Sequence, residues 1–300
     1  MIDGPSPFES KRELPDEALK AQARRLVGFA RRFARLRGQM RLLTDVDGVQ
    51  AWADAHHGGA PGLVAALADR YPLVIFEGDV GNGKTATAEA AADALARVLD
   101  VDGHLLKLST RVRGIGHVGE MSSLIGDAFD EALTSAGRKR FVALIVDEGD
   151  ALAFNRAAER AHHEDRVGVN TMIQKIDDAR KLRGRLLVIL CTNRFQALDP
   201  AVLRRAALIE TFKRPSDDER RELLDATLIG IDSDVATIES LVNATGPHDG
   251  RPGFTFSDIQ TRLIPLAVAR AFPDRPLTTA DLLAAVGELE PTPVMGENDA

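Results

Sequence analysis

The sequence has a single cysteine, Cys191, among its 300 residues. Disulfide frameworks, on which many small secreted domains depend, need cysteines in pairs. No apolar run approaches the ~18 residues that a membrane-spanning helix requires. The N-terminal residues MIDGPSPFESKREL also lack the apolar core of a secretory signal. These absences exclude disulfide-rich and membrane-spanning classes, and we expect a cytoplasmic protein with no membrane partner.

An excess of basic residues is missing as well. The 38 Lys and Arg residues are outnumbered by 45 Asp and Glu residues, which gives a formal charge of −7. Proteins that coat nucleic acid usually carry a basic footprint, so nucleic acid is not an expected partner. Aromatic residues make up only 5% of the chain, whereas the 44% of hydrophobic residues is typical of a globular protein. Composition indicates an enzyme-sized globular protein and leaves its chemistry open.

Five short apolar runs predict buried strands, at residues 73–78, 104–109, 140–147, 185–192 and 207–212. Helical periodicity appears between them, over residues 85–99, 120–136 and 166–182. Strands that are apolar on both faces and alternate with helices are typical of a parallel α/β sheet with right-handed crossovers. We therefore predict a parallel five-stranded sheet with flanking helices.

The segment before this sheet is predicted to be helical. Residues 1–15 contain three prolines and are expected to be loose, and one helix is expected from Asp16 to about Leu43, followed by helices over 47–57 and 61–70. The polar face of the long helix carries the arginines Arg24, Arg25, Arg31, Arg32, Arg35, Arg37 and Arg41. Such a face is either solvated or docks an acidic partner or nucleic acid.

A change of structural class is predicted near Pro215, where the strands stop. Ser216 and Glu219 have the spacing of a capped helix start, and helical patterns continue to about Val286. We therefore expect four regions: a helical N-terminal segment over 1–70, an α/β domain over 71–215, a helical domain over 216–290, and a disordered tail over 291–300.

Residues 78–85 read G-D-V-G-N-G-K-T and match the pattern G-x-x-x-x-G-K-[ST]. A glycine-rich turn points backbone N–H groups at a phosphate, and the helix that follows adds its positive end. Lys84 is expected to reach the β- and γ-phosphates, and the Thr85 hydroxyl to bind Mg²⁺. The predicted nucleotide-binding residues are Gly78, Asp79, Val80, Gly81, Asn82, Gly83, Lys84, Thr85 and Ala86.

Polar side chains follow two further strands. Asp147 and Glu148 end the run FVALIVDE, where a carboxylate faces the ligand crevice; Asp147 is expected to hold Mg²⁺, and Glu148 to polarise the attacking water. Asn193 ends the next strand and could orient water, although asparagine is also a common turn residue. Arg204 and Arg205 follow as either solvated charges or arginine fingers that reach a neighbouring subunit's nucleotide.

The order and spacing of GDVGNGKT, VDE, TN and LDPAVLRR resemble those of AAA+ ATPases. The resemblance extends from about Leu73 to Phe272, and it implies a phosphate-loop sheet followed by a small helical lid. It also implies a ring, usually of six subunits, with ATP and Mg²⁺ bound at subunit interfaces. In that arrangement Glu148 is the catalytic acid/base, Asn193 the first sensor, and Arg204 or Arg205 the finger.

Further segments resemble one branch of AAA+ proteins. Residues 120–129, EMSSLIGDAF, resemble the helix after the first pore loop of protein remodellers, which implies that His117 and Val118 line the pore. Residues 165–177 and the segment RRAALIETFKRP are similar to the pachytene-checkpoint remodellers, and the second segment aligns Arg205 with their finger. The short chain resembles the bacterial relatives in cyclic-oligonucleotide antiphage systems, and this implies a homo-hexamer that remodels a HORMA-domain protein.

Two positions depart from that pattern. His117 stands where the pore usually has an aromatic residue, and Ser257 stands where many relatives have a second sensor arginine; Arg262, one turn later, is the nearest substitute. Two other functions remain open. The chain could be an ATP-dependent nucleic-acid loader that grips DNA through the arginine helix, or an assembly switch that binds ATP without needing hydrolysis.

Overall fold

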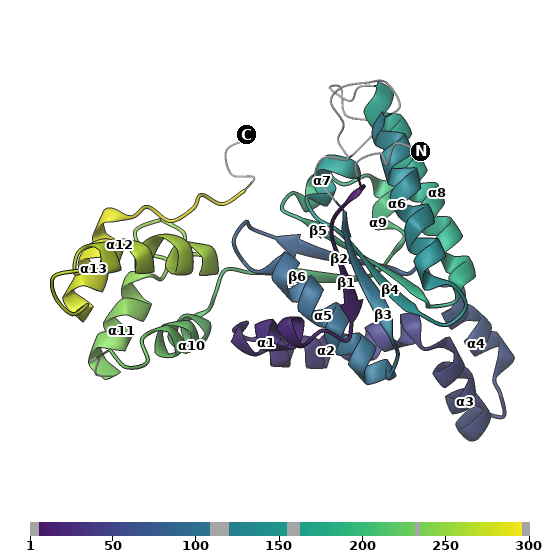
Figure 1. Cartoon of the computed structure of the whole chain (residues 1–300), viewed down its shortest axis with the longest axis horizontal. Helices are drawn as coiled ribbons and strands as arrows, with labels where there is room; N and C mark the ends of the chain where they lie inside the picture. The colour runs from purple at the N-terminus through teal and green to yellow at the C-terminus, as the bar shows by residue number, and fades with distance from the viewer. Residues whose placement is uncertain (1–5, 109–119, 155–162, 232–234, 296–300) are drawn as a thin grey trace. The chain divides into compact units, whose positions relative to one another are not determined.

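The structure, a computed structural model, describes residues 6–108, 120–154, 163–231 and 235–295 (Figure 1). The chain divides into two compact units. The first comprises Met1–Glu77 and Thr85–Thr211, and the second comprises Gly78–Lys84 and Phe212–Ala300. The longer segment of the second unit thus begins close to the predicted change of class at Pro215, and its shorter segment is the predicted phosphate loop up to Lys84.

A six-stranded sheet with the order β1-β3-β4-β5-β2-β6 forms the centre of the first unit. All five predicted strands are present, as β2 (Leu73–Gly78), β3 (Gly103–Leu108), β4 (Phe141–Val146), β5 (Leu186–Thr192) and β6 (Ala206–Phe212). The pairs β3–β4, β4–β5 and β5–β2 are parallel. Every residue of β4 and β5 is buried, as their continuous apolar sequences predict.

The sixth strand, β1 (Phe8–Leu14), was not predicted. It pairs antiparallel with β3 at the edge of the sheet, so the expectation that residues 1–15 are loose is wrong for this segment. Phe8 and Leu14 are buried, while most of the residues between them are exposed. Pro7 and Pro15 flank the strand, where a missing N–H group costs no ladder hydrogen bond.

Four helices follow β1: α1 (Glu17–Arg25), α2 (Phe29–Thr44), α3 (Val46–His57) and α4 (Pro61–Ala68). The single helix predicted over residues 16–43 is therefore two helices. The chain turns at Gly28, whose φ of 71° is a left-handed conformation that favours glycine. Asp16 caps α1 through its carboxylate, and its backbone N–H donates to Asp93 of α5 (Lys84–Leu99) at 2.7 Å.

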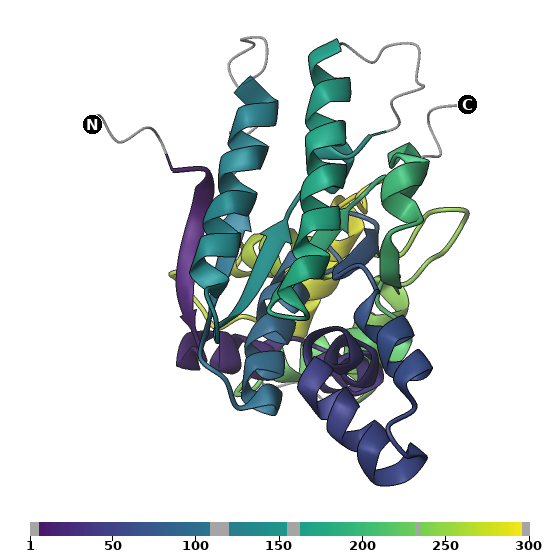
Figure 2. The same cartoon turned by 90° about the vertical axis from the view of Figure 1, so that its right-hand side faces the viewer.

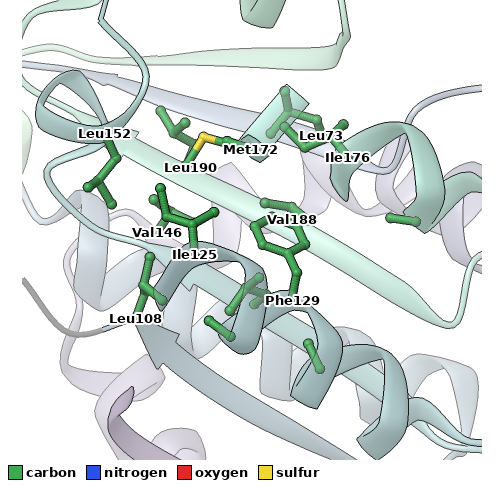
Figure 3. Packing of buried hydrophobic residues seen from close by; sticks show 14 of the residues in the cluster. Leu73, Leu108, Ile125, Phe129, Val146, Leu152, Met172, Ile176, Val188 and Leu190 are labelled. Atoms are coloured by element: carbon green, nitrogen blue, oxygen red, sulfur yellow. The ribbon is translucent and has the colours of Figure 1, made fainter. Parts of the chain in front are cut away.

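Helices cover both faces of the sheet. The helices α6 (Glu120–Ala136) and α8 (His163–Ala179) lie side by side over one face (Figure 2), and α5 lies on the other. Large apolar side chains join α6 and α8 to the sheet (Figure 3), among them Ile125, Phe129, Met172, Ile176, Val188 and Leu190. Each fully buried side chain of this size contributes about 1.5–3 kcal/mol. This packing fixes the ends of β4 and β5, where polar residues follow.

Short elements complete the first unit: α7 (Gly149–Leu152), η2 (Arg180–Leu182), η3 (Phe195–Ala197) and α9 (Pro200–Leu203). The second unit contains α10 (Asp217–Thr227), α11 (Val235–Ala244), η4 (Asp258–Leu263), α12 (Ile264–Ala269) and α13 (Thr279–Glu288). The predicted capping box begins α10, because Ser216 and Glu219 bond each other's backbone N–H groups. No described helix is long and apolar enough to cross a membrane.

Residues 291–295 lie at the end of the described chain, in the segment predicted to be a disordered tail. They form no helix or strand, but Thr292 and Met295 make hydrogen bonds to other residues of the second unit. These residues are therefore held in place by specific contacts.

Candidate nucleotide-binding site

The loop between β2 and α5 has a backbone that only glycine can adopt at two positions. Gly78 has a φ of 138°, and a Cβ atom there would lie 2.1 Å from the Phe212 carbonyl oxygen. Gly81 has a φ of 79°, and a Cβ atom there would lie 2.8 Å from Thr255 Oγ1. Gly78 and Gly81 are thus required by close approach of the backbone to its neighbours, as well as by the turn itself.

The Lys84 ammonium is held inside this loop. Its Nζ donates to the carbonyl oxygens of Gly78 at 2.7 Å and Asp79 at 2.8 Å, and the residue is only 6% exposed. Positive charge at the start of α5 adds to the partial charge of the helix N-terminus. A glycine-rich cradle with a fixed cation fits the phosphates of a nucleotide.

Thr85 and Asp147 are 62 residues apart in the sequence and adjacent in the structure. Thr85 Oγ1 donates to Asp147 Oδ2 at 2.9 Å, which joins the first turn of α5 to the end of β4. Hydroxyl and carboxylate oxygens are ligands that Mg²⁺ accepts in proteins. The donor set that the sequence predicted therefore fits a magnesium ion.

A lysine that sequence reasoning missed lies beside this pair. Lys107 on β3 places its Nζ 3.9 Å from Asp147 Oδ2, 3.8 Å from Glu89 Oε1 and 3.3 Å from Glu9 Oε1. The only sequence signal is one charged residue within the apolar run HLLKLS. The positive charge of Lys107 partly offsets the negative charge of these three carboxylates.

Glu148 has an unusual backbone conformation. Its φ of 50° and ψ of 44° lie in the left-handed region, and its side chain is exposed. A non-glycine residue in this region costs about 1 kcal/mol or more. Its backbone N–H donates to Asp147 Oδ1 at 3.0 Å, so the two carboxylates are positioned together. The turn leaves the Glu148 carboxylate accessible at the carboxyl end of β4.

Asn193 follows β5, and its position is fixed by another residue that sequence reasoning missed. Asp150 on α7 accepts from Thr192 Oγ1 at 2.9 Å and from the Asn193 backbone N–H at 3.4 Å. Asp150 therefore ties the end of β5 to the segment that follows Glu148. The feature that could have identified Asp150 is its position two residues after Glu148, in the first turn of α7.

Arg204 and Arg205 differ sharply in their surroundings. Arg205 is 8% exposed; its Nε and Nη2 donate to the two carboxylate oxygens of Asp177, and its guanidinium lies 5.3 Å from the Tyr71 ring centroid. These hydrogen bonds raise the pKa of Arg205 above its usual value. Arg204 is exposed, and no ion pair involves it within the described chain. Arg205 is thus committed to contacts within its own chain.

In the second unit, Ser257 and Arg262 take positions that sequence analysis left open. The Ser257 N–H donates to the Gly81 carbonyl at 3.1 Å, and Arg262 Nη1 donates to Asp258 Oδ1 at 2.8 Å. Burial alone would raise the pKa of Asp258, but hydrogen bonds from Thr292, Thr255 and Arg262 lower it below its usual value. In this structure Arg262 therefore pairs with Asp258 of its own unit.

The arginine face of the N-terminal helices is partly neutralised. Arg32 and Arg35 both donate to Glu210 of β6, and Arg41 pairs with Asp45 at 2.8 Å. The remaining exposed members include Arg24, Arg25 and Arg37. This face is thus a less continuous basic surface than the sequence alone suggests.

His117 and Val118, the predicted pore residues, lie outside the described residues. Cys191 is buried, as expected from its place in an apolar strand. No group of three or more His, Cys, Asp and Glu side chains within the described chain is placed to hold a metal ion.

Residues 74–214 match the family described as "ATPase family associated with various cellular activities (AAA)". CD-NTase-associated protein 6 of Escherichia coli strain KTE188 is 44% identical to the chain over 293 residues, which are 97% of this chain and 98% of that protein. The chain belongs to the AAA ATPase family. The predicted phosphate-loop fold and ATPase class are thereby confirmed, and nucleotide binding follows from membership of the AAA family.

Solved structures show which members of the AAA family this chain resembles in fold and sequence. One chain in the Escherichia coli MS115-1 HORMA:CdnC:Trip13 complex is 42% identical, with a TM-score of 0.89, and the match covers 96% of this chain and 97% of that one. Rhizobiales Trip13 is 39% identical, with a TM-score of 0.73 and coverage of 95% and 99%. The resemblance to short bacterial relatives, which match this chain over nearly their full length, is therefore confirmed.

Proposed function

We propose that this AAA ATPase uses ATP hydrolysis to remodel a HORMA-domain protein and so regulates a bacterial antiphage pathway. A Trip13 chain with the same fold and 42% identity occurs in a complex with HORMA and CdnC. Similarity over nearly the full length of both chains supports a partner of the same class for this chain.

The hydrogen bond between Thr85 Oγ1 and Asp147 Oδ2 is the observation that carries the chemistry. It brings the phosphate loop's hydroxyl to the strand-end carboxylate, and Glu148 follows directly. Thr85 and Asp147 would hold Mg²⁺, which when bound neutralises charge on the phosphate oxygens. Lys84 would bind the phosphates, Glu148 would accept a proton from the attacking water, and Asn193 would orient that water.

The proposed assembly is a homo-hexamer with ATP at subunit interfaces. An arginine that completes a neighbour's site must be free to leave its own subunit's surface, and Arg204 is the exposed member of the pair. We assign the finger to Arg204, and we assign Arg205 to support of the segment that presents it. His117 and Val118 are the proposed contacts to the protein substrate in the pore.

The test measures ATP turnover by the wild-type chain, Glu148→Gln and the control Glu13→Gln, each with and without a HORMA-domain protein from the same organism. Glu148→Gln should lower turnover at least ~100-fold, because it removes the general base, and should still bind ATP. The HORMA-domain protein should raise wild-type turnover.

Three outcomes would contradict this proposal. Unchanged turnover in Glu148→Gln would favour the assembly switch. Stimulation by DNA, with a steep dependence on salt, would favour the nucleic-acid loader. Wild-type turnover that no HORMA-domain protein changes would argue against the proposed substrate class.

A further inference from the structure

The phosphate loop of this chain contains a carboxylate. Asp79 occupies the second position of GDVGNGKT, a position that the motif leaves open. A negative charge beside a phosphate site opposes the binding of a nucleotide that carries several negative charges. The loop therefore needs a way to neutralise Asp79 or to direct its carboxylate elsewhere.

Arg214, immediately after β6, supplies the opposite charge. Its Nε donates to Asp79 Oδ2 at 2.9 Å, and both side chains are about 15% exposed or less. Its other two nitrogens donate to backbone carbonyls, Nη1 to Gly253 at 2.7 Å and Nη2 to Thr292 at 2.7 Å. Three partners fix the planar guanidinium, so its charge stays on Asp79.

The second Asp79 oxygen accepts a hydrogen bond from the backbone of the segment that follows α13. The Met295 N–H donates to Asp79 Oδ1 at 3.0 Å. Thr292 holds the same segment from the other side, because its N–H and Oγ1 donate to the two oxygens of Asp258 at 3.1 and 2.7 Å. Residues 291–295 thus form a short strap, fixed at Asp258 and Asp79.

Asp258 connects this strap to the inner part of the loop. It also accepts from the Thr255 N–H at 3.0 Å. Thr255 and Ser257 in turn approach Gly81 so closely that a Cβ atom there would clash with both. The phosphate loop, the start of η4, Arg214 and the strap therefore form one hydrogen-bonded network, with Asp79 at one end and Asp258 at the other.

We propose that Arg214 and the strap at residues 291–295 are positioning elements of the nucleotide site, which neutralise Asp79 and hold its carboxylate away from the phosphates. This inference rests on the nucleotide site described under the proposed function. Asp79 contributes its backbone carbonyl to Lys84, and its side chain is engaged by Arg214 and Met295.

The first experiment measures binding of a fluorescent ATP analogue to Arg214→Met, to Arg214→Met/Asp79→Asn and to the control Arg251→Met. Arg251 pairs with Glu290 at the surface, 56% and 71% exposed, outside the network. Arg214→Met should weaken binding about tenfold, the equivalent of one charge-assisted hydrogen bond. Adding Asp79→Asn should restore most of the affinity, because no unpaired carboxylate then remains in the loop.

The rescue separates neutralisation from a purely structural role. If Arg214 only joined segments of the second unit, Asp79→Asn would not restore affinity. The inference is therefore overturned if Arg214→Met binds as tightly as wild type, or if the double variant binds as weakly as the single one. Unfolding temperatures of all variants show whether each is folded. If Arg214→Met unfolds, Asp79→Asn alone keeps the test valid: it leaves the Arg214 charge without its carboxylate partner, so it should bind the ATP analogue more tightly than wild type, and equal or weaker binding would overturn the inference.

The second experiment removes the strap. A chain that ends at Glu290 should lose affinity for the ATP analogue, whereas a chain that ends at Met295 should bind like the full chain. Equal affinity of the two truncated chains would overturn the role of the strap. Lys84→Ala separates these results from failure of the proposed function: if it binds as tightly as wild type, the nucleotide site itself has been misassigned.

Discussion

Arg204 and Arg205 are neighbours in the sequence, yet the structure assigns them different environments. Arg205 is buried with its guanidinium on Asp177 and near Tyr71, while Arg204 is exposed. A fixed, internally bonded arginine would have to break two charge-assisted hydrogen bonds before it could reach another subunit. Arg204 is exposed and would reach another subunit without breaking such hydrogen bonds.

This contrast predicts that substitution of Arg204 affects ATP turnover, whereas substitution of Arg205 affects stability. Arg204→Ala should reduce ATP turnover about 10³-fold or more, as expected for loss of an arginine finger, with little change in unfolding temperature. Arg205→Ala should lower the free energy of unfolding by about 1.5–3 kcal/mol, because Asp177 loses its charged partner. Turnover assays and chemical denaturation of both variants check this. A stable Arg205→Ala chain together with a fully active Arg204→Ala chain would reverse the assignment.

Residues within a motif were predictable because their chemistry depends on local spacing. Lys84, Thr85, Asp147 and Glu148 were identified in this way. The structure brings Thr85 and Asp147 together, whereas the Lys84 ammonium donates to the carbonyl oxygens of its own loop, and its predicted contact with phosphates stays a prediction. Residues that act through distant contacts gave no such signal. Arg214 meets Asp79 across 135 residues, so only the folded chain shows that the pair exists.

At the level of elements, continuous apolar runs identified the five central strands because strands buried on both faces admit few polar residues. The edge strand β1 escaped detection because only Phe8 and Leu14 of its seven residues are buried. The break between α1 and α2 was not predicted for a different reason. Helical periodicity continues on both sides of Gly28, and a single glycine does not by itself end a helix.

The edge strand should nevertheless matter for stability. Phe8 packs into the main hydrophobic cluster and is 7% exposed. Phe8→Ala should lower the free energy of unfolding by about 3 kcal/mol through loss of buried area and creation of a cavity. Glu13→Ala, an exposed position on the same strand, should change it by less than about 0.5 kcal/mol. Equal effects of the two substitutions in urea denaturation would show that β1 does not stabilise the sheet through its buried face.

Over the whole molecule, the basic residues are distributed unevenly. The formal charge of −7 coexists with an arginine-rich N-terminal region, and part of that region is neutralised inside the chain by Glu210 and Asp45. Composition left the chemistry of the chain open, whereas the ordered motifs predicted the AAA family. The identity of the protein substrate depends on a partner's surface, which no residue of this chain encodes alone.

The most direct measurement follows a purified complex of a HORMA-domain protein with CdnC, incubated with this chain, ATP and Mg²⁺ and monitored by size-exclusion chromatography. We predict that the wild-type chain dissociates the complex and that Glu148→Gln, which binds ATP but does not hydrolyse it, leaves the complex intact. Dissociation at the same rate by Glu148→Gln, or no dissociation by a wild-type chain that hydrolyses ATP, would contradict ATP-driven remodelling.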